Sequence, residues 1–140
     1  MSKVAVVFWS GTGNTEAMAN SVVAGIESKG ATAEIVAVSD FNEEKINEYD
    51  AIAFGCPSMG AEQLEEGEFE PMFSAIESKL SGKKIALFGS YGWGDGEWMR
   101  NWEEQCKNAG AVMACDFVIC NGEPDDDAKK ACEALGASLV

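Results

Sequence analysis

The sequence feature that most constrains the fold is a short glycine-containing segment, residues 9–15 (Trp-Ser-Gly-Thr-Gly-Asn-Thr). The run before it, Val4–Phe8, is β-branched and aromatic, which is typical of a strand buried on both faces. From Asn14 onward, apolar side chains recur at helical spacing. A strand, a tight turn and a helix start in this order bring backbone N–H groups and the positive end of the helix dipole to one point. The segment therefore predicts an anion-binding site.

The side chains of this segment strengthen that prediction. The hydrogen-bond donors among them are Ser10, Thr12, Asn14 and Thr15. Gly11 and Gly13 allow the backbone to approach a ligand closely. The segment lacks the lysine of a Walker loop, and Glu16 replaces the third glycine of the dinucleotide-binding pattern. The donors favour a bound phosphate monoester over the alternative, a glycine-rich turn that only precedes a capped helix.

Strand and helix patterns alternate along the whole chain, which predicts a parallel sheet with helices on both faces. The expected strands are 4–9, 32–38, 51–56, 85–89 and 112–120, and the expected helices are 14–29, 42–48, 68–80, 98–108 and 125–138. Strand 32–38 alternates apolar and polar residues and is expected at an edge. We expect a single domain, residues 1–140, whose ligand lies beyond the carboxyl ends of the strands.

The composition excludes several kinds of function. The chain has no His, which rules out His-based catalysis and His-ligated metal, and its five Cys form no C-x-x-C pair that would indicate zinc. No apolar run has transmembrane length or the form of a signal peptide, so we expect a cytoplasmic protein. The net charge of −14 argues against nucleic acid and anionic membranes as partners. It favours a basic protein partner, unless the charge serves only solubility.

Two further loops follow predicted strands and have unusual content. They comprise Pro57, Ser58, Met59, Gly60, Ala61 and Glu62 in one, and Ser90, Tyr91, Gly92, Trp93 and Gly94 in the other. A tryptophan between glycines has few neighbours of its own to pack against. Trp93 is therefore either presented to a flat ligand or folded over the end of the sheet. Met59 and Trp93, on facing loops, are suited to enclosing a planar ring.

Taken together, these motifs resemble the short-chain flavodoxins of the clostridial type. The resemblance rests on residues 9–16 (Trp-Ser-Gly-Thr-Gly-Asn-Thr-Glu), 59–60 (Met-Gly) and 89–96 (Gly-Ser-Tyr-Gly-Trp-Gly-Asp-Gly), and it covers essentially the whole chain. It implies a flavodoxin-like three-layer α/β sandwich, with a five-stranded parallel sheet of order 2-1-3-4-5. It also implies a non-covalently bound FMN and no metal.

The resemblance assigns roles to individual residues. Those implied to hold the 5′-phosphate of FMN are Ser10, Thr12, Asn14 and Thr15. Trp93 would stack on the outer face of the flavin ring, while Met59 and Gly60 would lie against the inner face. Glu62 would accept a hydrogen bond from the flavin N3–H, and the turn that begins at Asn121 would close the site near the ring.

Two residues depart from the family pattern. Pro57 stands where some relatives have a hydroxyl residue, which removes one contact to the phosphate or ribityl chain without threatening FMN binding. Ala61 stands where relatives commonly have Asp, Asn, Ser or Gly, and this difference bears on redox tuning.

The implied function is a low-potential one-electron carrier without a substrate site of its own. The implied partners are basic-surfaced redox proteins, such as flavodoxin or ferredoxin reductases and ferredoxin-dependent oxidoreductases, and the carrier is expected to be a monomer. The charge pattern agrees, because Lys and Arg are absent from 4–28, 47–78 and 108–128, which contain most of the expected ligand-end loops.

Two other functions use a similar fold. A flavin enzyme such as a quinone reductase is the alternative, but it usually needs extra residues for a substrate pocket, and the loops here are short. A phospho-acceptor receiver domain needs an Asp at the end of the third strand and a Lys beyond the fifth. Residues 54–56 read Phe-Gly-Cys and residues 120–122 read Cys-Asn-Gly, which excludes it.

Overall fold

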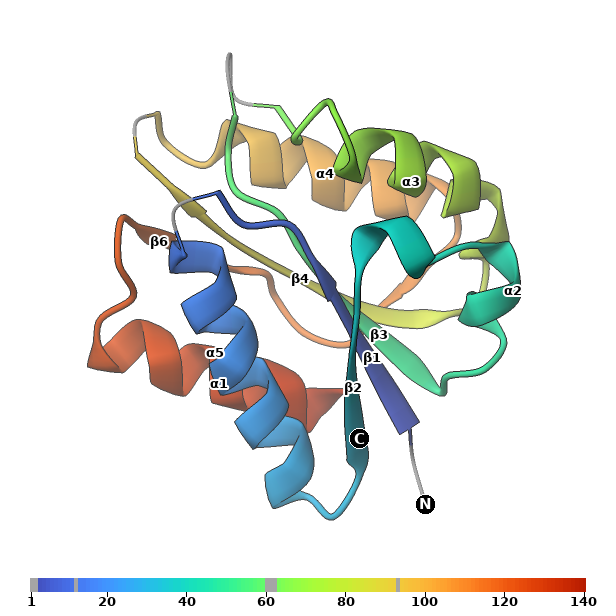
Figure 1. The fold of residues 1–140 in the computed structure, drawn as a ribbon, viewed down its shortest axis with the longest axis horizontal. Helices are drawn as coiled ribbons and strands as arrows, with labels where there is room; N and C mark the ends of the chain where they lie inside the picture. Colours follow the sequence, from blue (N-terminus) through green and yellow to red (C-terminus); the bar gives the residue numbers. More distant parts are fainter. Residues whose placement is uncertain (1–2, 12, 60–62, 93) are drawn as a thin grey trace.

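The alternating pattern folds into one sheet of parallel strands, in a computed structural model that describes residues 3–11, 13–59, 63–92 and 94–140. The strands are β1 (Lys3–Phe8), β2 (Thr32–Val36), β3 (Ala51–Gly55), β4 (Lys84–Tyr91), β5 (Val112–Met113) and β6 (Val118–Asn121). Their order is β2-β1-β3-β4-β5, with β6 also paired to β4 (Figure 1). The predicted order 2-1-3-4-5 is confirmed, and β2 lies at an edge as expected.

The predicted fifth strand, 112–120, is not continuous. It divides into β5 and β6, which pair with β4 at Met113↔Ile85 and Val118↔Phe88. Four residues, 114–117, therefore lie opposite only two residues of β4, 86–87. The extra residues make the chain bulge away from the ladder. An apolar run shows that a strand is buried but does not reveal extra residues between two paired segments. The single expected strand was wrong for this reason.

Helices cover both faces of the sheet (Figure 1). On one face lie α1 (Asn14–Ser28) and α5 (Asp126–Ser138), and on the other lie α2 (Glu43–Ile46), α3 (Phe69–Ile76) and α4 (Glu97–Asn108). Short 3₁₀ turns follow β2 and α3, namely η1 (Val38–Asp40) and η2 (Glu77–Lys79). Because side chains alternate along a strand, Val4 and Val6 enter the core under α1 and α5, whereas Ala5 and Val7 enter the other core. None of the helices in the described ranges is long and apolar enough to cross a membrane.

The two helices on the first face touch backbone to backbone. A Cβ atom added to Gly136 would lie 2.2 Å from the Val22 carbonyl oxygen, and one added to Gly25 would lie 1.9 Å from the Glu133 carbonyl oxygen. Only glycine permits so close an approach at both crossing points. The two helices on this face therefore leave no room for a side chain between them at these points.

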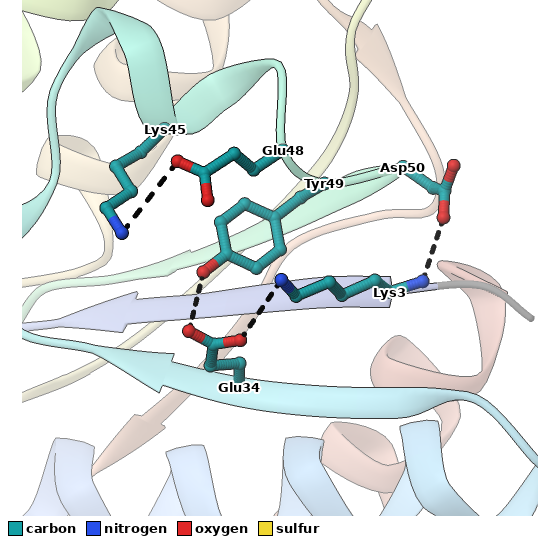
Figure 2. Close-up of polar contacts among 6 residues, drawn as sticks. All are labelled: Lys3, Glu34, Lys45, Glu48, Tyr49 and Asp50. Carbon is teal, nitrogen blue, oxygen red and sulfur yellow. Dashed lines mark hydrogen bonds and ion pairs between the residues drawn. The ribbon is translucent and has the colours of Figure 1, made fainter.

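A polar cluster at the amino end of the sheet ties β2 to the segment before β3 (Figure 2). The Tyr49 hydroxyl donates to Glu34 Oε1 at 2.9 Å, and Lys3 Nζ lies 3.5 Å from Glu34 Oε2. The backbone N–H of Lys3 donates to Asp50 Oδ2 at 2.8 Å. Burial of the ring, followed by the hydrogen bond to Glu34, raises the pKa of Tyr49 to about 12. The same hydrogen bond is the main cause that lowers the pKa of Glu34.

Replacing Tyr49 by Phe should lower the free energy of unfolding by about 1 kcal/mol at neutral pH, because one hydrogen bond to a half-exposed carboxylate is lost. The wild-type protein should also lose stability as the pH rises from 10.0, the ordinary pKa of tyrosine, towards about 12, since only the unfolded phenol ionises in that window. Tyr49→Phe should lack this part of the loss. Urea unfolding at neutral pH and again between these two pKa values measures both effects. Parallel pH profiles for the two proteins would contradict the assignment.

Candidate functional site

The loops after β1, β3, β4 and β6 meet at the carboxyl end of the sheet. Backbone hydrogen bonds continue the strand ladder into these loops, so their positions are fixed relative to one another. The bonds, donor first, are Trp9 to Gly55, Cys56 to Phe88, Ser58 to Ser90 and Gly122 to Tyr91, with N···O distances of 2.8–3.1 Å.

The first of these loops leads into the N-terminus of α1. Gly13 is the residue before the helix and has a φ of +93°, a conformation that favours glycine. The Ser10 Oγ atom accepts hydrogen bonds from the N–H groups of Gly13 (3.1 Å) and Glu16 (3.3 Å), so this side chain holds the turn in shape. Its own O–H remains able to donate. The N–H groups of Asn14 and Thr15 donate to no atom of the described residues, which leaves two helix N-terminal donors for an anion.

Two hydroxyl groups lie buried beneath this loop. The Oγ atoms of Thr15 and Ser90 are 2.9 Å apart, and the Ser90 N–H donates to Thr15 Oγ1 at 3.4 Å. This pair fastens the first turn of α1 to β4. Nearby, the Ser58 Oγ atom is buried and has no hydrogen-bond partner within the described ranges. A buried hydroxyl in this state indicates a missing polar partner.

A cavity of about 220 Å³ lies between the loops. Its lining residues are Trp9, Gly11, Asn14, Thr15, Pro57, Ser58, Met59, Ser90, Tyr91, Gly92 and Gly122. All of them except Gly122 were singled out from the sequence as cofactor-binding residues. Gly122 belongs to the turn that begins at Asn121, which was expected to close the site.

The other predicted site residues fall into two groups. Ser10, Gly13, Gly94 and Asn121 are described by the structure but do not line this cavity, and Asn121 borders a separate hollow next to Tyr91. Those that lie outside the described residues are Thr12, Gly60, Ala61, Glu62 and Trp93.

Volume alone would not select this cavity. Several other hollows are larger, among them one of about 440 Å³ at Asn121 and two, of about 550 Å³ and 480 Å³, along α3 and α4. The loop cavity is the better candidate because Asn14, Thr15 and Ser58 line it, and within the described ranges the N–H groups of the first two and the buried hydroxyl of the third have no hydrogen-bond partner.

The loop after β3 closes on itself as a hairpin. Met59 and Gln63 form an antiparallel bridge, in which the N–H of each residue donates to the carbonyl of the other at 2.8 Å and 2.9 Å. Residues 60–62 connect them. The bridge holds Met59 at the mouth of the cavity.

Glu65 anchors this hairpin to α3. Its own N–H donates to the Cys56 Sγ atom at 3.4 Å, back at the end of β3. Its carboxylate accepts hydrogen bonds of 2.7–2.8 Å from the N–H groups of Gly67, Glu68 and Phe69. Burial raises the pKa of Glu65, but these donors outweigh it, and the pKa lies below its ordinary value. Side chains usually cap a helix from the residue just before it, which is Glu68 for α3. Sequence reasoning missed Glu65 because it lies three residues earlier.

Replacing Glu65 by Ala should lower the free energy of unfolding by about 1–2 kcal/mol, since the first turn of α3 loses its cap. The difference from wild type should be complete above pH 4.5, the ordinary pKa, and should shrink as the pH falls through the lower folded pKa. Glu68→Ala is the matched control, because Glu68 precedes α3 but its side chain makes no capping hydrogen bond. Chemical unfolding at several pH values measures both variants, and equal losses would show that Glu65 is not the cap.

The cysteines divide into two groups. Cys56, Cys106 and Cys132 are buried, and burial raises the pKa of each thiol to about 12. Cys115 and Cys120 are only partly buried and pack against the core under α1 and α5. Cys115 lies in the break between β5 and β6, whereas Cys120 lies in β6 and pairs with Ser90 of β4. Within the described ranges, no cluster of acidic or Cys side chains is placed to hold a metal ion.

The fold and the loop cavity define a class of protein, namely an α/β protein with a parallel sheet and a cavity among the loops at the carboxyl ends of its strands, where ligands bind in open α/β sheets. A family model described as Flavodoxin matches residues 6–135. The chain belongs to the flavodoxin family, whose members are FMN-containing electron carriers. The expectations of FMN and of an electron-transfer role in place of enzymatic activity are thereby confirmed.

Individual relatives agree with this assignment. The chain is 46% identical over 135 residues to a flavodoxin of Clostridium beijerinckii, with 96% of this chain and 97% of the relative covered. It is 45% identical over 137 residues to a flavodoxin of Megasphaera elsdenii, with 98% of each covered. The solved structure of the two-electron reduced flavodoxin of Megasphaera elsdenii matches with a TM-score of 0.89 at 45% identity, covering 97% of both chains. An electron carrier of this family passes electrons between redox proteins.

Proposed function

We propose that the loop cavity is the FMN site and that the phosphate of FMN binds at the N-terminus of α1. The proposal rests on three groups from residues that line the cavity: the N–H groups of Asn14 and Thr15 and the hydroxyl of Ser58, none of which has a hydrogen-bond partner among the described residues. Backbone donors and hydroxyl groups suit a phosphate monoester, and the helix dipole supplies the positive potential that a lysine would supply in a Walker loop.

The residues proposed to hold the phosphate, besides these backbone groups, are the side chains of Ser10, Thr12, Asn14 and Thr15. The residues proposed to hold the ring are Trp93 on the outer face, Met59 and Gly60 on the inner face, and Glu62 at N3–H. When bound, FMN accepts and releases electrons, while the protein orients the ring and shapes its electrostatic environment. The hairpin bridge between Met59 and Gln63 supports this placement, because it fixes the residue that would border the ring.

We further propose that the carrier works at low potential. Acidic residues gather at the flavin end, including Glu65, Glu66, Glu123 and Asp125, and the basic Arg100 nearby is paired with Asp95 at 3.0 Å. Negative charge around the site opposes the addition of further negative charge to the flavin. The same surface suits basic redox proteins, such as reductases and oxidoreductases, as partners of a single-domain, monomeric, cytoplasmic carrier.

Raising the salt concentration should therefore raise the second one-electron potential. Exposed charges more than about 10 Å from the ring are screened at ordinary ionic strength, so their opposition to reduction weakens. Electrochemistry of the FMN-loaded protein over a salt series makes the measurement. A second potential that does not move would assign the low value to contacts next to the ring and not to the acidic surface.

Titration of the apoprotein with FMN tests the proposed site itself. Fluorescence should reveal one FMN per chain, with the flavin emission quenched on binding. The hydroxyl-deleting variant Ser58→Ala should bind FMN more weakly than wild type, because Ser58 lines the cavity and its buried hydroxyl has no hydrogen-bond partner in the part of the chain that the structure describes. Unchanged affinity in this variant would remove Ser58 from the site.

A further inference from the structure

The two faces of the sheet differ in how their helices pack. On the first face, α1 and α5 meet at Gly25 and Gly136, with no room for a side chain between them. On the other face, the two hollows along α3 and α4, about 550 Å³ and 480 Å³, share Asn101 and Gln105 as lining residues. They form one groove, which we call the α3–α4 groove. Figure 1 shows both helices lying over the same side of the sheet.

The groove exists because polar rows line it from both helices. Glu70, Ser74 and Glu77 recur at helical spacing along α3 and into η2, and the facing row of α4 includes Asn101 and Gln105. The Ser74 hydroxyl donates to Glu70 Oε1 at 2.6 Å, so these two members of the α3 row are hydrogen-bonded to each other. Polar rows of this kind do not interdigitate as apolar ridges do, and the helices therefore leave a channel between them.

The groove is acidic along its whole length. Its charged lining residues in the described ranges are Glu66, Glu70, Glu77 and Glu104, and no Lys or Arg is among them. The basic residues of α4 are engaged elsewhere, Arg100 with Asp95 at 3.0 Å and Lys107 with Glu103 at 3.4 Å. A cationic occupant would meet no like charge in the groove.

A second, independent observation is a buried donor at the wall of the groove. Trp98 and Trp102 both line the part of the groove next to Glu66 and Glu70, and both are almost fully buried. The indole N–H of Trp98 donates to the Cys56 carbonyl at 3.2 Å, whereas that of Trp102 has no acceptor among the described residues. A buried donor without an acceptor is unfavourable, so a carbonyl group of an occupant that accepted this hydrogen bond would favour binding.

The spacing of the charges selects the kind of occupant. Glu70 and Glu77 are seven positions apart on α3 and η2, which corresponds to about 10 Å along a helix axis. No group of acidic residues in the described ranges is close enough to hold one metal ion. A polyproline II chain has three residues per turn and advances about 3.1 Å per residue, so basic side chains three residues apart lie on one side of it, about 9 Å from each other, and would match these carboxylates. The amides of Asn101 and Gln105 are suited to the backbone of such a chain.

From these observations, we propose that the α3–α4 groove docks an extended basic segment of a redox partner protein. This surface is separate from the flavin cavity, although the two adjoin, because Gln63 lines the groove and is bridged to Met59 at the cavity. A docked segment would therefore contact the hairpin that borders the flavin site. The proposal rests on the electron-carrier function but not on the proposed position of FMN.

The test is an NMR titration of the FMN-loaded, ¹⁵N-labelled protein with a synthetic peptide of repeated Lys-Ala-Ala units. The Trp102→Phe variant identifies the indole resonance of Trp102. We expect this resonance to shift and saturate, because an acceptor reaches the buried N–H. No shift of Trp102, with shifts confined to residues near Glu123 and Asp125 at the flavin end, would overturn the proposal.

Two double variants with the same change in net charge distinguish binding in the groove from a general effect of net charge. Glu77→Gln with Glu104→Gln removes charge from the groove, and Glu27→Gln with Glu133→Gln removes it from the exposed surfaces of α1 and α5. The groove variant should bind the peptide about fivefold more weakly and the control less than about twofold, because each exposed ion pair contributes modestly. Equal losses would mean that only net charge matters. Both variants should retain wild-type FMN affinity, so a failure of the FMN site and a failure of the groove give different results.

Discussion

Riboflavin should bind to the apoprotein about 100- to 10,000-fold more weakly than FMN. The two flavins share the ring and the ribityl chain, so the difference isolates the phosphate. The N–H groups of Asn14 and Thr15 donate to no atom of the described residues, and each hydrogen bond to a charged group contributes about 1.5–3 kcal/mol. Two such bonds alone give about 3–6 kcal/mol, which corresponds to the stated ratio. Fluorescence titration of one apoprotein preparation with both flavins measures it.

The Ser10→Ala variant tests how much the Ser10 side chain contributes to phosphate binding by holding the loop in shape. Because Ser10 Oγ accepts from the N–H groups of Gly13 and Glu16, its loss should disturb the turn and weaken FMN more than riboflavin. Thr32→Ala, remote from the loop on β2, is the control and should leave the ratio unchanged. Equal affinities of the wild-type protein for FMN and riboflavin would remove the α1 N-terminus from the site.

Replacing Trp93 by Ala should weaken FMN binding by about 1–3 kcal/mol, or roughly 5- to 150-fold, by analogy with aromatic side chains that stack on nucleic-acid bases. Trp93 lies outside the described residues, and the expectation rests on its place between glycines in a loop that borders the cavity. The variant should also quench bound flavin less efficiently. Trp93→Phe is the conservative control and should retain part of the affinity, because it keeps an aromatic face.

The alternative position of Trp93 gives a different result. A tryptophan folded over the end of the sheet would stabilise the apoprotein, so Trp93→Ala would lower its unfolding free energy while changing FMN affinity little. Measuring both quantities on the same variant therefore decides between the two positions. Unchanged affinity and unchanged flavin emission would show that the side chain does not stack on the ring.

Hydrophobic periodicity predicted most of the fold. Runs such as Val4–Phe8 and Ala51–Gly55 are buried on both faces because helices cover both sides of a parallel sheet, and this leaves a clear signature in sequence. The break between β5 and β6 left no such signature. Four residues, 114–117, span what two residues span on β4, and pairing of this kind depends on the neighbouring strand.

The candidate site was predictable where backbone chemistry determines it. Glycines and short polar residues at the end of a strand indicate a ligand loop, and the residues singled out there include almost all of the cavity lining. The detailed hydrogen bonds were not predictable. Ser10 holds the turn, Thr15 pairs with the buried Ser90, and Glu65 caps α3, and each of these contacts depends on tertiary positions that spacing alone does not give.

The most direct test of a one-electron carrier is a redox titration of the purified, FMN-loaded protein, followed by its visible spectrum. We expect two separate one-electron steps, with the second at markedly lower potential than the first, because the site's acidic surroundings oppose the second electron. A single two-electron step, with no spectrum belonging to an intermediate level of reduction, would contradict the assignment of a one-electron carrier and favour a flavin enzyme instead.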